Sequence, residues 1–267
     1  MKPVLPEPFV RQAGAGPTVV CLHSNASSSV QWRGLMEQLA PSFRVLAPDS
    51  YGAGKSPEWP SDRTISLDDE VRLLQPVISK GPDKLVLIGH SYGAAVGMIA
   101  ALRYPERVRA LIVCEPTLFM LEEVAVAPPN GVDGIRCAVD FAGQALDAGD
   151  LDTAAGHFID FWMGSGSWAS TPYERKSAIS KSIVNVRRWR HALMTEPTPL
   201  SAFASLNMPV LYMTGGRSPE SVHAVARRLV PILPNVTALN FNDLGHMAPV
   251  THADTVNAAI VDFLRKL

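Results

Sequence analysis

A serine stands at the centre of residues 89–93, GHSYG, which have the spacing G-x-S-x-G. This stretch follows an apolar run rich in strand formers (residues 84–88) and precedes an apolar helical pattern. A sharp turn from strand to helix exposes a serine hydroxyl and requires small neighbours, which Gly89 and Gly93 provide. The positive end of the helix dipole favours negative charge at that point. The pattern therefore predicts that Ser91 is a nucleophile.

A serine hydroxyl is a weak nucleophile at neutral pH and needs a base. His246 follows the last apolar run of the chain and precedes a C-terminal helical pattern, so it is the best candidate. His90 lies inside the serine turn. The remaining candidates lie in helical patterns or shortly after His246, and they fit less well: His157, His191, His223 and His252.

An anionic intermediate also needs two backbone N–H donors. One is expected to be the amide of Tyr92, directly after the nucleophile, and the other to come from the loop after the apolar run 17–22.

Three further segments carry a resemblance to a known family. They are LHSNASSSVQW (22–32), PDSYGAGKS (48–56) and RYPERVRALIV (103–113). Together with GHSYG and the terminal histidine, they resemble the α/β-hydrolase superfamily, serine hydrolases with a helical cap. The resemblance covers the chain outside its middle third, and it implies that the amide of Asn25 is the second oxyanion donor. Ser24 replaces the usual glycine of the oxyanion loop, so we expect a slightly different loop shape. Tyr51 replaces a usual arginine, which removes a structural charge.

The acid of the triad is the open question. In most of the family it follows the strand at 209–216, where this chain has Ser218, which we interpret as the N-cap of a helix. In a minority, haloalkane dehalogenases among them, the acid follows the preceding strand, where this chain has Glu115. We predict Glu115. Glu220, Asp243 or a site without an acid remain the alternatives.

Continuous apolar runs predict strands that are buried on both faces, as in a parallel sheet. Helical patterns separate several of them, which predicts an α/β fold with a doubly wound, mostly parallel sheet. The runs lie at 17–22, 43–48, 84–89, 109–116, 209–216 and 236–241, and the helical patterns at 32–40, 68–79 and 220–230. Residues 117–206 show helical patterns without a clear strand. We therefore predict a hydrolase core at 1–116 and 207–267, with 117–206 as a helical cap inserted over the carboxyl ends of the strands.

Composition limits the classes of function. A formal net charge of −1 gives no electrostatic footprint for nucleic acid or acidic lipid. The apolar run 85–102 approaches the length of a membrane span but contains polar residues and glycines. Prolines interrupt the first ten residues, where a signal peptide would need an apolar helix. The three cysteines, Cys21, Cys114 and Cys137, lack metal-like spacing. We expect reduced thiols, a cytoplasmic protein and no membrane partner.

The predicted activity is hydrolysis of a carboxylic ester or related carbonyl compound through an acyl-enzyme on Ser91, with His246 as base and Glu115 as its partner. Haloalkane dehalogenases and epoxide hydrolases carry aspartate at the nucleophile position, so acyl transfer is favoured here. No metal or organic cofactor is implied, and the expected partner is a small substrate with an apolar part. Carbon–carbon hydrolysis, thioester hydrolysis and peracid formation at the same site remain alternatives, as does a non-enzymatic ligand receptor. Aromatic residues of the insertion either line an apolar pocket or form its own core: Phe141, Phe158, Phe161, Trp162 and Trp168.

Overall fold

The computed structural model describes residues 6–59, 64–80 and 83–267, which contain one seven-stranded sheet in the order β1-β3-β2-β4-β5-β6-β7. The strands are β1 (Val10–Ala13), β2 (Thr18–Leu22), β3 (Arg44–Pro48), β4 (Leu85–His90), β5 (Val108–Cys114), β6 (Val210–Gly215) and β7 (Val236–Phe241). Among these strands only β1 is antiparallel to its neighbour, so the predicted mostly parallel sheet is confirmed. The sequence analysis missed β1, because this four-residue edge strand is only partly buried and has no apolar run.

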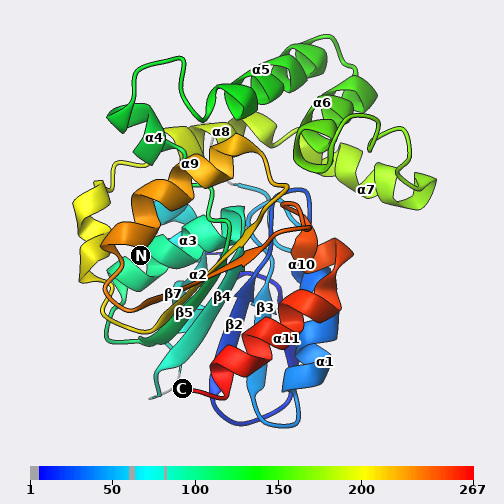
Figure 1. Ribbon diagram of the computed structural model, residues 1–267. Coiled ribbons are helices and arrows are strands. Elements are labelled where there is room, and N and C mark those ends of the chain that lie inside the picture. Colours follow the sequence, from blue (N-terminus) through cyan, green and yellow to red (C-terminus); the bar gives the residue numbers. More distant parts are fainter. Residues whose placement is uncertain (1–5, 60–63, 81–82) are drawn as a thin grey trace, which may run out of the picture.

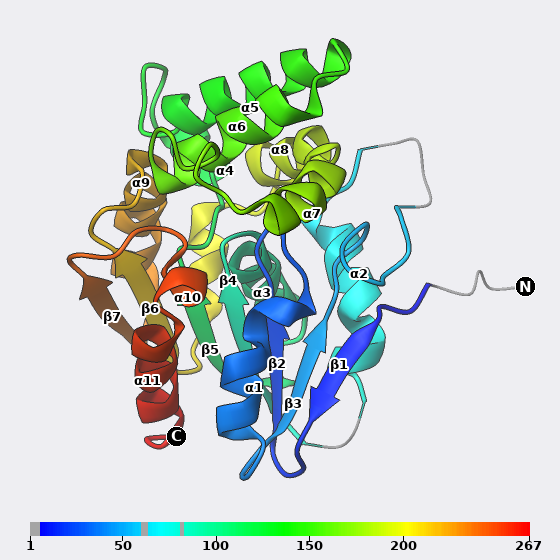
Figure 2. The same ribbon diagram turned by 90° about the vertical axis from the view of Figure 1, so that its right-hand side faces the viewer.

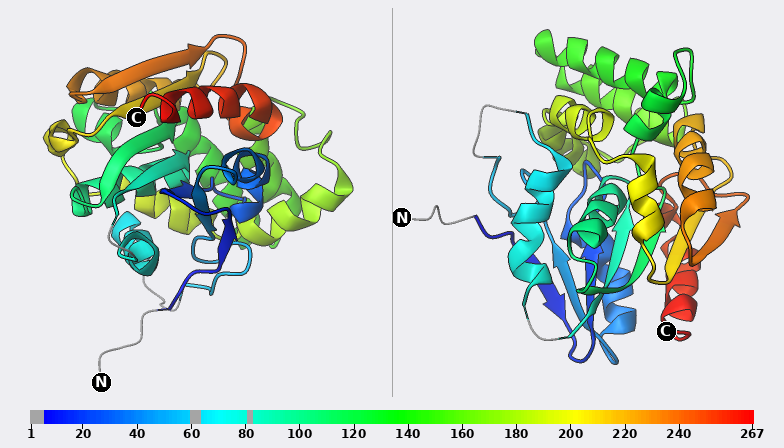
Figure 3. Two further views of the ribbon diagram at one scale, coloured as in Figure 1. Left: turned by 90° about the horizontal axis from the view of Figure 1, so that it is seen from below. Right: turned by 90° about the vertical axis from the view of Figure 1, so that its left-hand side faces the viewer.

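Helices cover both faces of the sheet (Figures 1 and 2). On one face lie α1 (Arg33–Leu39) and α11 (Ala253–Leu264), packed against strand residues such as Val19 and Cys21. On the other lie α2 (Leu67–Ile78), α3 (Tyr92–Arg103) and α9 (Glu220–Leu229), packed against alternate residues such as Val20 and Leu22. Successive side chains of a strand point to opposite faces, so a sheet with two cores needs strands that are apolar throughout. Figure 3 shows α11 and α2 on opposite sides of the strands.

The start of α2 is fixed by a capping box. The side chain of Ser66 accepts a hydrogen bond from the amide of Asp69 (3.2 Å), and the Asp69 carboxylate accepts one from the amide of Ser66 (3.0 Å). Two N–H groups that have no partner inside the helix are thereby satisfied. The next residue, Glu70, is buried beneath the serine turn.

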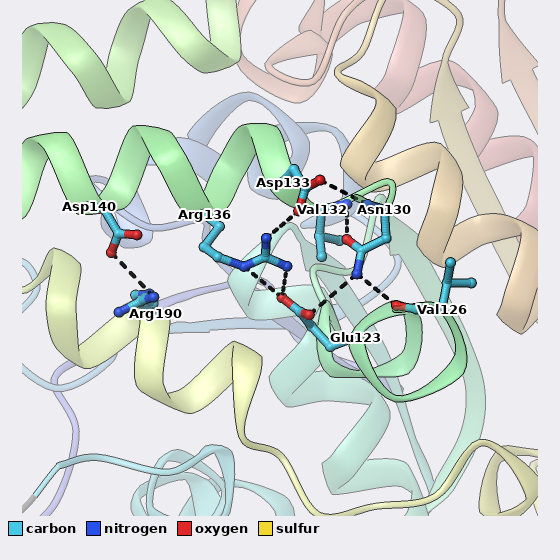
Figure 4. Close-up of polar contacts among 8 residues, drawn as sticks. All are labelled: Glu123, Val126, Asn130, Val132, Asp133, Arg136, Asp140 and Arg190. Atoms are coloured by element: carbon cyan, nitrogen blue, oxygen red, sulfur yellow. Dashed lines mark hydrogen bonds and ion pairs between the residues drawn. The ribbon is translucent and has the colours of Figure 1, made fainter. Parts of the chain in front are cut away.

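Five helices lie between β5 and β6 and form what we call the helical layer. They are α4 (Met120–Ala125), α5 (Asp133–Asp147), α6 (Leu151–Met163), α7 (Tyr173–Ile183) and α8 (Val186–Met194), followed by the 3-10 helix η2 (Leu200–Ser205). Figures 1 and 2 show α5 to α8 above the edge of the sheet at which the parallel strands end. Within the layer, Arg136 of α5 binds Glu123 of α4 and Asp133 (Figure 4). The pair with Glu123 ties α4 to α5, and the pair with Asp133 lies within α5.

In residues 6–59, 64–80 and 83–267, no helix is both long and apolar enough to cross a membrane. Residues 1–5, which carry part of the expectation about export, lie outside the described residues. All three cysteines are free; Cys21 and Cys114 are buried and Cys137 is exposed.

Candidate active site

Ser91 occupies a strained turn between β4 and α3, with φ of 55° and ψ of −116°. A residue other than glycine rarely adopts such a conformation, and holding it costs on the order of 1–3 kcal/mol. The turn leaves no room for side chains beside it. A Cβ atom on Gly93 would lie 2.4 Å from the carbonyl oxygen of Leu22, and one on Gly89 would lie 2.6 Å from the Cα of Ala94. The two glycines of the motif are therefore steric requirements of this turn.

The structure brings three of the predicted site residues into one hydrogen-bond chain. Nε2 of His246 lies 3.0 Å from Oγ of Ser91, and Nδ1 of His246 lies 2.5 Å from Oε2 of Glu115. All three side chains are buried. They come from distant parts of the chain: the β4–α3 turn, the end of β5, and the loop between β7 and the short helix α10 (Ala248–Thr251).

Glu115 is held by the ends of two neighbouring strands. Its backbone has φ of 50°, and its Oε1 accepts hydrogen bonds from the amide of Gly215 and the hydroxyl of Ser218, each 2.6 Å long. Burial on its own would raise the pKa of Glu115, but the hydrogen bonds from His246, Gly215 and Ser218 outweigh burial and hold that pKa below its usual range. The carboxylate is therefore ionised at neutral pH.

The prediction that Ser218 caps a helix is wrong. Helix α9 begins at Glu220 with Pro219 as its N-cap, and no side chain caps it. The Ser218 hydroxyl instead donates to Glu115, because the loop after β6 folds back over the end of β5. Ser218, which occupies the position where the resemblance implies an acid, therefore holds the carboxylate of Glu115 from the neighbouring strand.

The two alternative acids have other partners. Glu220 forms an ion pair with Arg227, and Asp243 forms one with Arg217 at 3.4 Å. Both carboxylates are largely exposed. Of the three candidate acids, Glu115 is the one that contacts His246.

A second hydrogen-bond chain links the loop after β2 to the loop that carries His246. Burial lowers the pKa of His90 to about 3, so its ring is neutral. Its Nε2–H donates to the carbonyl oxygen of His246 (2.9 Å), and its Nδ1 accepts from the amide group of Gln31 (3.1 Å). Oε1 of Gln31 then accepts from the amide and the hydroxyl of Ser24, at 3.1 and 3.0 Å. The serine that departs from the family pattern is therefore one end of this chain.

Sequence reasoning missed this link. Gln31 and His90 are 59 positions apart, and no local pattern joins them.

The loop after β2 places Asn25 on the wall of the pocket that contains Ser91. The next residue, Ala26, has φ of 53°, which turns the chain sharply at this point. Tyr92 is the first residue of α3, so its amide lies at the free N-terminal end of that helix. Both predicted oxyanion donors therefore belong to turns next to the nucleophile.

Glu70 is a buried acid that the sequence analysis did not single out. Its carboxylate accepts hydrogen bonds from the hydroxyl of Tyr92 (3.2 Å) and the amide of Tyr51 (3.3 Å). Burial raises the pKa of Glu70 to about 8. Glu70 thus joins the serine turn to the loop after β3, where Tyr51 stands in place of the family's arginine.

A narrow pocket lies between Ser91 and the helical layer. Its interior volume of about 20 Å³ is room for about one water molecule and lies well below the range for small-molecule sites. Phe158 and Trp162 line it, and the Trp162 ring stacks on His246 with 3.9 Å between centroids. Phe161 packs edge-on against Trp162. The wall is mostly apolar, and its remaining members are Asn25, Thr117, Phe119, Ile135, Val139, Val186, Trp189, Arg190, Leu193 and Met194.

Phe141 and Trp168, two of the five aromatic residues named from the sequence, lie away from this pocket, whereas Phe119 and Trp189 of the same insertion line it. Phe141 is 51% exposed, and Trp168 is buried within the layer, where its indole N–H donates to Asp152. Both readings of the five aromatics were therefore partly correct.

Comparison with known proteins places this arrangement in context. A family model for the α/β hydrolase fold matches residues 17–253. The chain is 30% identical to 2-(acetamidomethylene)succinate hydrolase of Mesorhizobium japonicum, over 85% of this chain and 81% of that protein. It is 26% identical to pimeloyl-[acyl-carrier protein] methyl ester esterase of Vibrio campbellii, over 94% and 95% of the two chains. Several further curated relatives are matched over only 30–38% of their length. Among solved structures, MenH from S. aureus has a TM-score of 0.79 at 18% identity, covering 96% of this chain and 98% of that one.

Proposed function

Because the chain belongs to the α/β-hydrolase fold family, we propose that it is a serine hydrolase that cleaves a carboxylic ester through an acyl-enzyme on Ser91. The observation that carries the proposal is the continuous chain from Ser91 Oγ through both nitrogens of His246 to Glu115. A nucleophile in contact with a base that is itself oriented by an acid is the arrangement required for acyl transfer.

The direction of proton transfer follows from the partners of the imidazole ring. Glu115 is ionised, so it accepts a hydrogen bond from Nδ1–H and leaves Nε2 without a proton. Nε2 can then take the proton of Ser91 as Oγ attacks the ester carbonyl, and can return it to the departing alcohol. A water molecule activated by the same nitrogen would release the acid.

Negative charge on the carbonyl oxygen would be stabilised by the amides of Tyr92 and Asn25. Support for this role comes from their places: Tyr92 opens α3, and Asn25 lines the pocket beside Ser91. Loss of one such donor in other serine hydrolases costs about 10²–10³ in kcat.

A second candidate is hydrolysis of a different bond next to a carbonyl group by the same three residues. The relatives bear names of an ester hydrolase and of a hydrolase that acts on 2-(acetamidomethylene)succinate. The Ser91–His246 contact supplies a hydroxyl nucleophile for either bond, so the assay below distinguishes the two candidates.

The test is labelling with a fluorophosphonate probe, together with hydrolysis of short-chain p-nitrophenyl esters. The folded protein should incorporate one label and cleave the esters, and Ser91→Ala should abolish both. Ser205→Ala, which alters an exposed serine of η2, is the matched control. Labelling without ester cleavage would favour the second candidate. A folded protein in which Ser91 stays unlabelled would instead favour a ligand receptor.

A further inference from the structure

One charged side chain lines the otherwise apolar pocket above Ser91, among the residues that the structure describes. It is Arg190, on α8. The same arginine, with Val139 and Met194, also lines a more open groove between α5 and α8. Arg190 therefore stands where the enclosed pocket meets the groove that opens to solvent.

The hydrogen-bonding capacity of Arg190 is largely unused. A guanidinium group has five N–H donors. Within the described ranges, this group forms one ion pair, in which Nη2 of Arg190 lies 3.2 Å from Oδ1 of Asp140 on α5. Both side chains are more than 40% exposed, so the pair contributes little to stability.

Two nearby arginines of this layer, Arg136 and Arg187, form more hydrogen bonds than Arg190 does. Arg136 binds Glu123 and Asp133 through several hydrogen bonds (Figure 4). Arg187, on the same helix as Arg190, bonds the carbonyl of Gly143 (2.7 Å) and Asp147 (2.6 Å). Figure 4 shows Arg190 paired with Asp140, apart from the Arg136 cluster. Arg190 is thus the arginine of this group that can bind a ligand without losing a structural role.

A second polar group in the pocket also lacks a partner. The hydroxyl of Thr117 is buried and has no hydrogen-bond partner in the part of the chain that the structure describes. Leaving such a group unpaired is costly, and most buried hydroxyls are satisfied. A pocket wall with one unpaired hydroxyl and one underused guanidinium is built for a ligand that carries oxygen atoms.

We propose that the substrate is a carboxylate-bearing acyl compound whose carboxylate binds Arg190 while its ester carbonyl lies at Ser91. The wall between these two points is mostly apolar, so a substrate that widens the narrow pocket would place the methylene groups of its acyl chain against apolar side chains. The guanidinium fork binds a carboxylate through two parallel hydrogen bonds, and it already holds one in Asp140. This inference deepens the proposed ester hydrolysis and rests on it.

The test compares monoethyl esters of dicarboxylic acids, from succinate to suberate, with ethyl esters of the monocarboxylic acids of equal chain length. Hydrolysis is followed by titration of the released acid at constant pH. At the best chain length, the ratio of kcat/KM for the charged ester to that for the neutral ester should exceed about ten in the wild-type protein. Arg190→Gln should reduce that ratio about ten- to hundredfold, and Arg190→Lys should reduce it less.

Arg187→Gln is the matched control, because it removes the same charge from the same helix at a residue that does not line the pocket of Ser91. An equal fall of the ratio in Arg187→Gln would show long-range attraction instead of binding at Arg190 and would overturn the proposal. So would a wild-type preference for the neutral esters, or an unchanged ratio in Arg190→Gln.

Binding to Ser91→Ala, measured by calorimetry, separates the two proposals. If Ser91→Ala binds the charged ester more tightly than the neutral ester, and adding Arg190→Gln removes this difference, the carboxylate site is supported. This holds even if the wild-type protein cleaves neither ester. Absence of fluorophosphonate labelling, by contrast, counts against the hydrolase alone. Equal binding of both esters would refute the role of Arg190.

Discussion

Glu115→Gln is the substitution that tests the triad most directly. In the native protein Oε1 of Glu115 accepts hydrogen bonds from the amide of Gly215 and the hydroxyl of Ser218. Because a backbone amide can only donate, the oxygen of a glutamine side chain must occupy that place. Its NH₂ group then faces Nδ1 of His246, 2.5 Å from the native carboxylate oxygen. Nδ1 is forced to accept, the proton moves to Nε2, and the nitrogen beside Ser91 can no longer act as base.

The magnitude can be worked from the same geometry. Centres of charge about 4 Å apart interact by about 4 kcal/mol at an effective dielectric constant of about 20. Loss of that attraction for the imidazolium formed during catalysis corresponds to about a thousandfold in rate. The equivalent change in a serine protease triad costs on the order of 10⁴ in kcat. We therefore expect a loss in kcat between about 10² and 10⁴.

The assay is steady-state hydrolysis of a short-chain p-nitrophenyl ester, with thermal unfolding to verify that the variant is folded. Ser218→Ala removes one of the two donors to Oε1 and should cost at most about tenfold. Glu220→Gln changes an exposed carboxylate paired with Arg227 and should leave kcat unchanged. A folded Glu115→Gln protein with kcat within about tenfold of the wild-type value would refute the assignment of Glu115 as the acid.

Three further predictions concern the same region. Thr117→Val replaces an unpaired buried hydroxyl by a methyl group. The free energy of unfolding should therefore stay equal or rise by about 1 kcal/mol at most, while kcat/KM for the charged esters falls. A loss of stability together with the loss of kcat/KM would contradict a ligand role for Thr117. Burial raises the pKa of Glu70 from 4.5 to about 8, so the folded protein keeps a proton that the unfolded chain releases. The free energy of unfolding should therefore decrease from pH 4.5 to pH 8, by up to about 1.4 kcal/mol per pH unit, and urea titrations of Glu70→Gln should show a flatter pH profile; equal profiles would disprove the effect. Gly93→Ala places a Cβ 2.4 Å from the carbonyl oxygen of Leu22 and should abolish folding. Gly97→Ala should yield folded protein, because the nearest atom to its new Cβ is a side-chain carbon at 3.4 Å. Circular dichroism can verify both outcomes.

Local patterns in the sequence were sufficient for most of the fold and for two members of the site. Continuous apolar runs predicted six of the seven strands. In β2 to β6 burial on both faces explains this short-range signature, but the predicted burial of β7 is wrong, because all its residues are partly or fully exposed. The glycines around Ser91 predicted a strained turn, since the constraint acts between neighbours in the chain. The position of His246 after the last strand indicated the histidine that lies 3.0 Å from Oγ of Ser91 in the structure. The edge strand β1 left no such signature and was missed.

Only the tertiary structure decided which carboxylate meets His246. Glu115 and His246 are 131 residues apart, and Ser218 meets Glu115 across 103 residues. The outcome depends on the turn of the backbone after β5 and on how the loop after β6 folds back, neither of which has a local pattern. For the same reason, the positions of Trp162 and Arg190 in their helical patterns did not indicate whether each residue lies in the core or lines a pocket. A helix face becomes a pocket wall only through the element packed opposite to it, and that pairing is set by contacts between segments far apart in the chain.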